Sequence, residues 1–219
     1  MIEWLNSIDT QALLALNSLH ASYFDNFMML FSGKIIWAPM YAALLFVVVR
    51  NFRWRQVVAV VLGVAFAIAI ADQVCASVIR PVVCRLRPSN LENPISSAVH
   101  IVNGYRGGAY GFPSCHAANS FALAAFMSLL FANWRLSLTL FGWAVVNSYS
   151  RVYLGVHYPG DLIVGALIGI VTGLLTAAVA RFAANRLDRP QVLPSVNTGI
   201  ATSVAGLTVI GIATASALM

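Results

Sequence analysis

Long apolar stretches run through most of this chain, and short segments between them carry most of the charged residues. Five stretches reach or approach the roughly 20 residues that a helix needs to cross a bilayer. A sixth, from Leu136 to Tyr149, becomes long enough if the helix continues to Trp134 and Val152. The pattern predicts an all-α polytopic membrane bundle of about six transmembrane helices. The five stretches are Phe27 to Val49, Val57 to Ile79, His116 to Ala132, Leu162 to Ala180 and Asn197 to Leu218.

The N-terminal segment that precedes these stretches, Met1 to Asp25, differs from them because it mixes apolar and polar residues. Its leucines and Ile8 share one broad helical face, which predicts an amphipathic helix lying in the membrane interface. A positively charged start and a small-residue cleavage site are both missing, so a removed signal peptide is not expected. We therefore expect residues 1–219 to form a single membrane domain that begins with an interfacial helix over residues 1–25. The residues of the apolar face are Ile8, Leu13, Leu14, Leu16 and Leu19.

Composition agrees with a membrane location. The chain is 60% hydrophobic and only 9% charged, with a mean hydropathy of +0.82, which excludes an ordinary soluble globule of this size. If the helices alternate in direction, seven arginines fall on one face, which the positive-inside rule assigns to the cytoplasm. Five more arginines lie in loops of the opposite face, which in a bacterium is the periplasmic side of the inner membrane. The net charge of +6 thus reflects orientation and a site, not a nucleic-acid surface. The seven are Arg50, Arg53, Arg55, Arg135, Arg181, Arg186 and Arg189.

Three short polar runs on that opposite face contain the candidate chemistry. Three arginines suit a multiply charged anion, while two histidines and a carboxylate suit a nucleophile, its orienting partner and a general acid. The acidic residues are too few and too scattered for a magnesium site, so the pattern predicts phosphoryl transfer without a metal or another cofactor. The runs are Arg80 with Arg87-Pro88, then Pro113-Ser114-Cys115-His116, then Ser150-Arg151 with His157 and Asp161.

Each run also has an ordinary structural explanation. Pro113 suits the first turn of a helix, where free N–H groups and the helix dipole favour an anion, but such a start can carry an incidental histidine. Asp161 falls in the first turn of the next apolar stretch, where a carboxylate can merely cap a helix or can reach back to His157. A lone arginine at this depth usually extends to the interface. The three runs together favour a site.

The complete pattern resembles the signature of the type 2 phosphatidic acid phosphatase superfamily. The order basic-x6-Arg-Pro, Pro-Ser-x-His and Ser-Arg-x5-His-x3-Asp is present from Arg80 to Asp161. The resemblance implies a membrane enzyme that acts on lipid phosphates and diphosphates. It also implies that His157 forms a phosphohistidine, that His116 protonates the leaving group, and that water completes the hydrolysis.

The chain departs from the family pattern at two positions. Arg80 stands where the family usually has lysine, which keeps the charge and adds a planar fork for phosphate oxygens. Cys115 stands where the family usually has glycine. Its backbone N–H can still point at an anion provided that the position is helical.

The polar loop from Ser89 to Phe112 is rich in glycine and is expected to act as a mobile lid over the site, not as a packed domain. Arg106 in this loop is a candidate for one more phosphate contact, against the alternative of a solvated charge. The sequence leaves open a disulfide between Cys84 and Cys115, because it does not give their separation. It also leaves the oligomeric state open.

The sequence thus predicts hydrolysis of a lipid phosphate at the non-cytoplasmic surface. Among small bacterial members of the family, undecaprenyl diphosphate phosphatases come slightly ahead of lipid A phosphatases, because their role is more general. Phosphatidylglycerophosphate and phosphatidate remain alternatives. A phosphotransferase would use the same intermediate with a lipid acceptor. A non-catalytic lipid-binding scaffold has no need for His116, His157 and Asp161 together.

Overall fold

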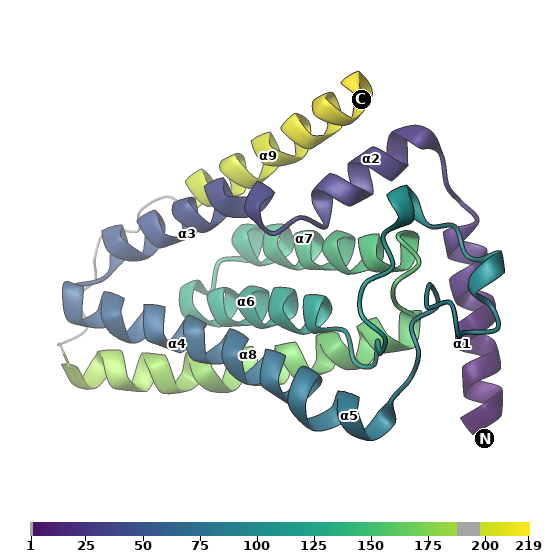
Figure 1. Ribbon diagram of the computed structural model, residues 1–219. Coiled ribbons are helices and arrows are strands. Elements are labelled where there is room, and N and C mark those ends of the chain that lie inside the picture. Colours follow the sequence, from purple (N-terminus) through teal and green to yellow (C-terminus); the bar gives the residue numbers. More distant parts are fainter. Residues whose placement is uncertain (1, 188–197) are drawn as a thin grey trace.

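The computed structural model describes residues 2–187 and 198–219, and all named secondary structure in these ranges is helical (Figure 1). Short turns at Ile35–Trp37, Ser96–Ala98 and Val102–Gly104 complete the chain path. A π-helical segment, Val74–Ile79, joins α4 to α5 without a break. The helices are α1 (Ile2–Asn17), α2 (Ser22–Phe31), α3 (Ala38–Asn51), α4 (Trp54–Gln73), α5 (Arg80–Val83), α6 (Cys115–Phe131), α7 (Trp134–Tyr153), α8 (Pro159–Leu187) and α9 (Gly199–Leu218).

Four helices, α4, α6, α7 and α8, run side by side, and α3 and α9 lie over one face of this group (Figure 1). By length and composition, three helical runs can cross a membrane: Trp54–Val83, Pro159–Arg186 and Gly199–Leu218. The α2 and α3 pair passes the same test as one bent span, and α6 is apolar but shorter. The chain is therefore an integral membrane protein with an all-α bundle. The expected number of about six transmembrane helices stays a prediction.

The expected continuous span from Phe27 to Val49 is wrong in one respect, because the helix breaks. The helices α2 and α3 meet at an angle of 70° across a short connection. The indole Nε1 of Trp37 donates to the carbonyl oxygen of Phe31 at 2.8 Å, which satisfies a group at the end of α2. Pro39 lies in the first turn of α3, where its missing N–H has no cost.

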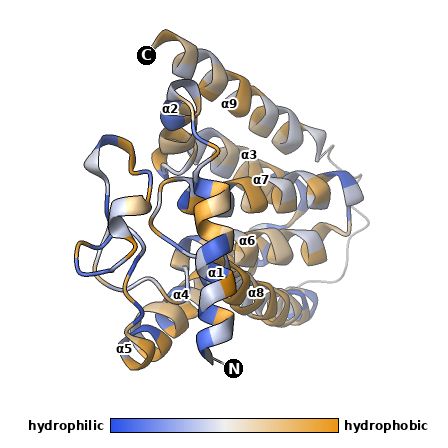
Figure 2. Cartoon of the chain, turned by 90° about the vertical axis from the view of Figure 1, so that its right-hand side faces the viewer, coloured by the Kyte–Doolittle hydropathy of each residue, from blue (hydrophilic) through white to orange (hydrophobic). Residues whose placement is uncertain are grey.

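The expected helix over residues 1–25 is also two helices in the structure. The first, α1, ends at Asn17, whose side-chain nitrogen donates to the carbonyl oxygen of Tyr153 at 2.7 Å. Figure 2, which looks onto this end of the molecule, shows α1 lying across the ends of the bundle helices. Its predicted apolar face divides, since Leu13 is buried while Ile8 and Leu19 are exposed. The orientation of α1 across the ends of the bundle helices suits a helix in the membrane interface, and the interfacial location stays a prediction.

The two ends of the bundle carry different connections. The α3–α4 turn, the α6–α7 turn and the end of α8 lie at one end, whereas the long loop over residues 84–114 lies at the other (Figure 1). Six of the seven arginines expected at the cytoplasmic face belong to the first group, and Arg189 lies outside the described residues. The motif arginines belong to the second end, as the alternation of the apolar stretches predicts.

Small residues bring α6 and α8 into close contact. An added Cβ at Gly169 would lie 2.2 Å from the carbonyl oxygen of Ala118, and one at Gly165 would lie 2.4 Å from that of Ser114. Gly173 repeats the same close approach one turn later. Glycine every fourth residue lets two membrane helices approach to backbone distance. This seam fixes the start of α6, with its Pro-Ser-Cys-His run, against the start of α8, with Asp161.

Candidate active site

The centre of the site is a buried histidine and carboxylate pair. The Nδ1 atom of His157 lies 3.2 Å from Oδ2 of Asp161, and both side chains are almost fully buried. The same carboxylate oxygen accepts the backbone N–H of Tyr158 at 3.0 Å. Because Asp161 is in the first turn of α8 and His157 is in the preceding connection, the carboxylate reaches back to the ring, as the sequence analysis expected.

The hydrogen bonds of His157 define which ring nitrogen is reactive. Nη1 of Arg87 lies 2.8 Å from Nε2, and a guanidinium can only donate. Nε2 is therefore the acceptor, and Nδ1 carries the proton that Asp161 accepts. The single lone pair of Nε2 is directed at Arg87, so this hydrogen bond has to open before Nε2 can attack a phosphate.

The protonation state follows from burial and from the neighbouring charges. Burial lowers the pKa of His157 to about 4, and the positive charges of Arg87 and Arg151 act in the same direction. The hydrogen bond to Asp161 opposes this shift without reversing it. His157 is therefore neutral at physiological pH, which is the form that can act as a nucleophile.

The three predicted arginines share one unusual property. Within the described residues, the buried Nε atoms of Arg80, Arg87 and Arg151 have no hydrogen-bond partner. Burial lowers the pKa of Arg87 to about 10, and the charges of Arg151 and Arg80 add to the effect, so the guanidinium groups lie within electrostatic range of one another. Three neighbouring cations with unused donors form a site for an anion with several oxygens.

The start of α6 supplies the second motif. Ser114 is the N-cap, and its hydroxyl oxygen accepts the N–H of Ala117 at 3.4 Å, so its own proton is available to a ligand. The backbone N–H of Ser114 donates to the carbonyl oxygen of Asp161 at 3.0 Å. His116 forms a hydrogen bond with the backbone of Ser32 and lies within electrostatic range of Arg151 and His157. The two histidines therefore belong to one site.

The two departures from the family pattern meet in space. Nη2 of Arg80 lies 3.0 Å from Sγ of Cys115 and donates to the carbonyl oxygen of Pro113 at 2.9 Å. Cys115 is the first residue of α6, so the helical condition for its backbone N–H is met. The arginine fork thus reaches the residue that replaces the expected glycine.

The loop over Ser89–Phe112 covers the site but is tied to it. Residues 85–87 and 109–111 pair in a short antiparallel bridge, in which the N–H of Arg87 donates to the carbonyl oxygen of Ala109 at 3.0 Å. An added Cβ at Gly111 would lie 3.1 Å from Oδ2 of Asp161, so a side chain there would have little room beside the pair. We describe this loop as a packed cover.

Within this loop, Tyr105 contacts the motif residues and Arg106 does not. Nη2 of Arg151 donates to the Tyr105 hydroxyl oxygen at 2.9 Å, and Nη1 donates to the hydroxyl oxygen of Ser32. Arg106 instead donates to the carbonyl oxygen of Ser89 at 2.5 Å. A phosphate contact by Arg106 stays a prediction. Tyr105 lies in a loop without a regular pattern, so no sequence signal pointed to it.

Two further charged residues belong to the site although the sequence analysis did not select them. Nη1 of Arg85 lies 2.9 Å from Oδ1 of Asp161 and 2.7 Å from Oδ2 of Asp9. Arg85 is two residues from the predicted Arg87, and this proximity could have identified it as a site residue. Asp9 is on α1, and its role depends on a contact between segments 76 residues apart.

The three cysteines are free thiols. Cys84 is exposed and donates to the carbonyl oxygen of Pro81, whereas Cys115 faces Arg80. The structure therefore does not contain the disulfide that the sequence left open. Among the residues described, no three His, Cys, Asp or Glu side chains are grouped so that they could hold a metal ion.

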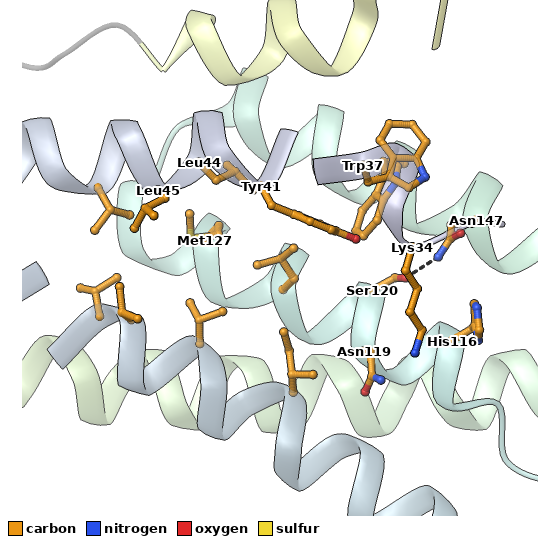
Figure 3. Close-up of a pocket in the computed structure, with 18 of the residues that line it drawn as sticks. Lys34, Trp37, Tyr41, Leu44, Leu45, His116, Asn119, Ser120, Met127 and Asn147 are labelled. Atoms are coloured by element: carbon orange, nitrogen blue, oxygen red, sulfur yellow. Dashed lines mark hydrogen bonds between the residues drawn. The ribbon is translucent and has the colours of Figure 1, made fainter. Parts of the chain in front are cut away.

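An apolar pocket of about 410 Å³ begins beside His116. Figure 3 shows Lys34 extending toward Asn119 and His116 at one end of the pocket, with Tyr41 and Leu44 further from the site. The far part is lined by Val48 of α3, by apolar residues of α4, and by Leu123 and Met127 of α6. The pocket thus runs between these helices from the polar site toward the opposite end of the bundle.

Comparisons with known proteins agree with this site. A sequence model described as the PAP2 superfamily matches residues 57–185, more than half of the chain and all three polar runs. The chain is 50% identical to a lipid A 4'-phosphatase of Bacteroides thetaiotaomicron over 200 residues, which cover 91% of this chain and 89% of the relative. It is 33% identical to a lipid A 4'-phosphatase of Porphyromonas gingivalis over 84% of this chain and 78% of the relative.

A further relative has a different named substrate. The chain is 30% identical to an undecaprenyl-diphosphatase of Sulfolobus acidocaldarius over 81% of this chain and 77% of the relative. Among solved structures, LpxE of Aquifex aeolicus superposes with a TM-score of 0.57 at 22% identity, covering 77% of this chain and 94% of that one. That likeness concerns the fold. From the motif geometry and these sequence matches, the chain belongs to the PAP2 superfamily and is a membrane phosphatase of this family.

Proposed function

We propose that this protein removes a phosphate from a membrane lipid by nucleophilic attack of His157, without a metal ion. One observation carries the proposal. A buried neutral histidine, oriented by Asp161, lies beside three arginines whose Nε donors are unused. Phosphoryl transfer needs a positioned nucleophile and positive donors around the equatorial oxygens, and this group of residues supplies both.

In the first step, the phosphate binds to Arg80, Arg87 and Arg151, and Nε2 of His157 attacks phosphorus. The bond between phosphorus and the lipid oxygen breaks as the new N–P bond forms. His116 gives its proton to the departing oxygen. Asp161 accepts the hydrogen bond from Nδ1 and stabilises the positive charge that develops on the ring.

In the second step, water attacks the phosphohistidine. His116, now neutral, accepts a proton from the water as the new O–P bond forms and the N–P bond breaks. Inorganic phosphate leaves, and both histidines return to their starting states.

We propose a phosphate of lipid A, at the 4' position, as the first candidate substrate. The support is the 50% identity to a lipid A 4'-phosphatase over nearly the whole chain. Undecaprenyl diphosphate, which the sequence analysis placed first, becomes the second candidate, with 30% identity to a relative of that name. Phosphatidylglycerophosphate and phosphatidate follow.

The apolar pocket supports a lipid leaving group. It begins at His116, the residue proposed to protonate the leaving oxygen, and continues between apolar residues of α3, α4 and α6. A volume of about 410 Å³ is within the usual ~300–1,000 Å³ of small-molecule sites. We propose that one hydrocarbon chain of the substrate lies in this pocket and that Lys34 contacts an anionic group near the site.

The proposed location is the bacterial inner membrane, with the site at the periplasmic face. The support is the distribution of basic residues, since the turns opposite the site carry most of the remaining arginines. The substrate phosphate would then be at the outer surface of that membrane.

The test is phosphate release by the detergent-purified protein in the presence of EDTA. The panel contains lipid A, undecaprenyl diphosphate, phosphatidylglycerophosphate and phosphatidate. His157→Ala should lower release at least ~10³-fold because the nucleophile is lost. His20→Ala is the control, since His20 is an exposed histidine stacked on His100 away from the dyad. Loss of activity in EDTA that returns with magnesium would contradict the mechanism. Transfer of the phosphate from a labelled substrate to an acceptor lipid would identify a phosphotransferase.

A further inference from the structure

One guanidinium connects two carboxylates at the edge of the site. Nη1 of Arg85 lies 2.9 Å from Oδ1 of Asp161 and 2.7 Å from Oδ2 of Asp9. The Arg85 guanidinium also lies over the Tyr158 ring, 3.7 Å from its centroid, which limits its movement. Asp161 therefore receives a donor from His157 on one oxygen and a donor from Arg85 on the other.

Asp9 is bound to the start of α8 by a second contact. Its Oδ1 accepts the backbone N–H of Gly160 at 2.7 Å. An added Cβ at Gly160 would lie 2.7 Å from Oδ2 of Asp9, so the absence of a side chain at this position permits the close approach. A carboxylate at the N-terminus of a helix is also favoured by the helix dipole. Asp9 thus contacts both the backbone beside Asp161 and the arginine that binds it.

The rest of α1 holds Asp9 in this place. Asp9, Leu13 and Asn17 are four residues apart and share one helical face. Leu13 is fully buried and packs in one cluster with Val99 and other residues of the loop and of α7. Asn17 donates to the carbonyl oxygen of Tyr153 at 2.7 Å. Three successive turns of α1 are therefore fixed against the site.

We propose that Asp9 is a positioning residue for the catalytic pair, acting through Arg85. The inference rests on the proposed role of His157 as nucleophile. Asp9 lies on α1, outside the residues 57–185 that match the family model. By sharing Arg85, Asp9 reduces the extent to which that cation neutralises Asp161, and it leaves more negative charge to stabilise a cationic His157.

The charges around His157 and Asp161 determine in which direction each variant should shift the protonation of His157. Arg85, Arg87 and His157 face Asp161, and Arg87, Arg151 and His116 act on His157. Tyr158 lies beside Asp161, Arg85 and Asp9. Removal of the negative charge of Asp9 should make protonation of His157 harder, and removal of the positive charge of Arg85 should make it easier.

The experiment compares Asp9→Asn with Arg85→Gln. The asparagine keeps an oxygen that can accept the N–H of Gly160, so it mainly removes charge. Glu3→Gln is the matched control, because Glu3 is an exposed acid on the same helix. Two quantities are measured: kcat/KM for phosphate release from lipid A or undecaprenyl diphosphate against pH, and the titration of His157 by NMR of 15N-histidine-labelled protein in micelles.

We expect Asp9→Asn to lower the titration midpoint of His157 by about 0.5–1 pH unit and kcat about 10-fold, with little change in KM. Arg85→Gln should move the midpoint in the opposite direction, while Glu3→Gln should leave it unchanged. A role in folding alone would leave the midpoint of the folded protein unchanged in both variants, and that result would overturn the inference. Failure of the proposed function is distinct, because the wild-type protein would then release no phosphate from any lipid.

Discussion

The polar site and the apolar pocket meet at His116, yet they are built in different ways. Around His157 and Asp161, many polar atoms form hydrogen bonds, and the buried Nε atoms of Arg80, Arg87 and Arg151 are without a partner among the described residues. Along the pocket, the wall consists mainly of apolar side chains from α3, α4 and α6, with few polar groups after Asn119. From this contrast we propose that the polar site carries out the reaction and that the pocket selects the lipid.

The largest effect should come from breaking the seam that assembles the polar site. Gly169→Leu would place a side chain where a Cβ alone lies 2.2 Å from the backbone of α6. The starts of α6 and α8 should separate, with activity lost on every substrate and a lower melting temperature in detergent. Gly142→Leu is the control, since a Cβ there has open space. Retained activity in the Gly169 variant would show that the seam does not organise the site.

The pH dependence of the wild-type protein tests the polar site without a mutation. His157 must be neutral to attack, and burial lowers its pKa to about 4. Activity should therefore appear as the pH rises through about 4. Below the acid midpoint, kcat/KM should fall about tenfold for each pH unit. An acid midpoint near 6.5, the value of an ordinary histidine, would contradict the burial argument.

The pocket should control the choice of lipid and leave the chemistry intact. Val64→Trp places a large ring in the pocket wall. We expect kcat/KM for a long-chain lipid phosphate to fall about 10-fold, with less than about twofold change for a soluble aryl phosphate. Val145→Trp is the control, since Val145 is 55% exposed on α7 and does not line the pocket. An equal loss of kcat/KM on both substrates would show that the substitution disturbs folding and that the pocket does not select the lipid.

The smallest expected effect concerns Lys34, where the pocket and the polar site join. Lys34→Gln should raise KM by about three- to tenfold for lipids with a second anionic group, because one exposed cation contributes a modest attraction. Substrates without such a group should be unaffected. Arg135→Gln, at the opposite end of the bundle, serves as the control. An equal change in KM for both kinds of lipid would show that Lys34 does not select the substrate.

The helices and the motif chemistry could be read from local patterns. Each apolar stretch after residue 54 corresponds to a helix, because a helix satisfies the backbone of such a run in a bilayer, although α8 continues seven residues beyond the expected end at Ala180. The break between α2 and α3 was missed because Ser32 and Gly33 interrupt an otherwise apolar stretch only briefly. The end of α1 at Asn17 was missed because its contact is with α7, far along the chain.

The membrane bundle, the family and the three polar runs could all be predicted from the sequence, since hydropathy and motif spacing are local properties. The packing of distant segments, in contrast, brings Arg80 to Cys115 and links Asp9 and Arg85 to Asp161, and it forms the apolar pocket that begins at His116. The physical reason is distance along the chain. These contacts form when α1, the loop after α5 and the starts of α6 and α8 pack together, and a hydrogen bond between such segments leaves no periodic trace in either one.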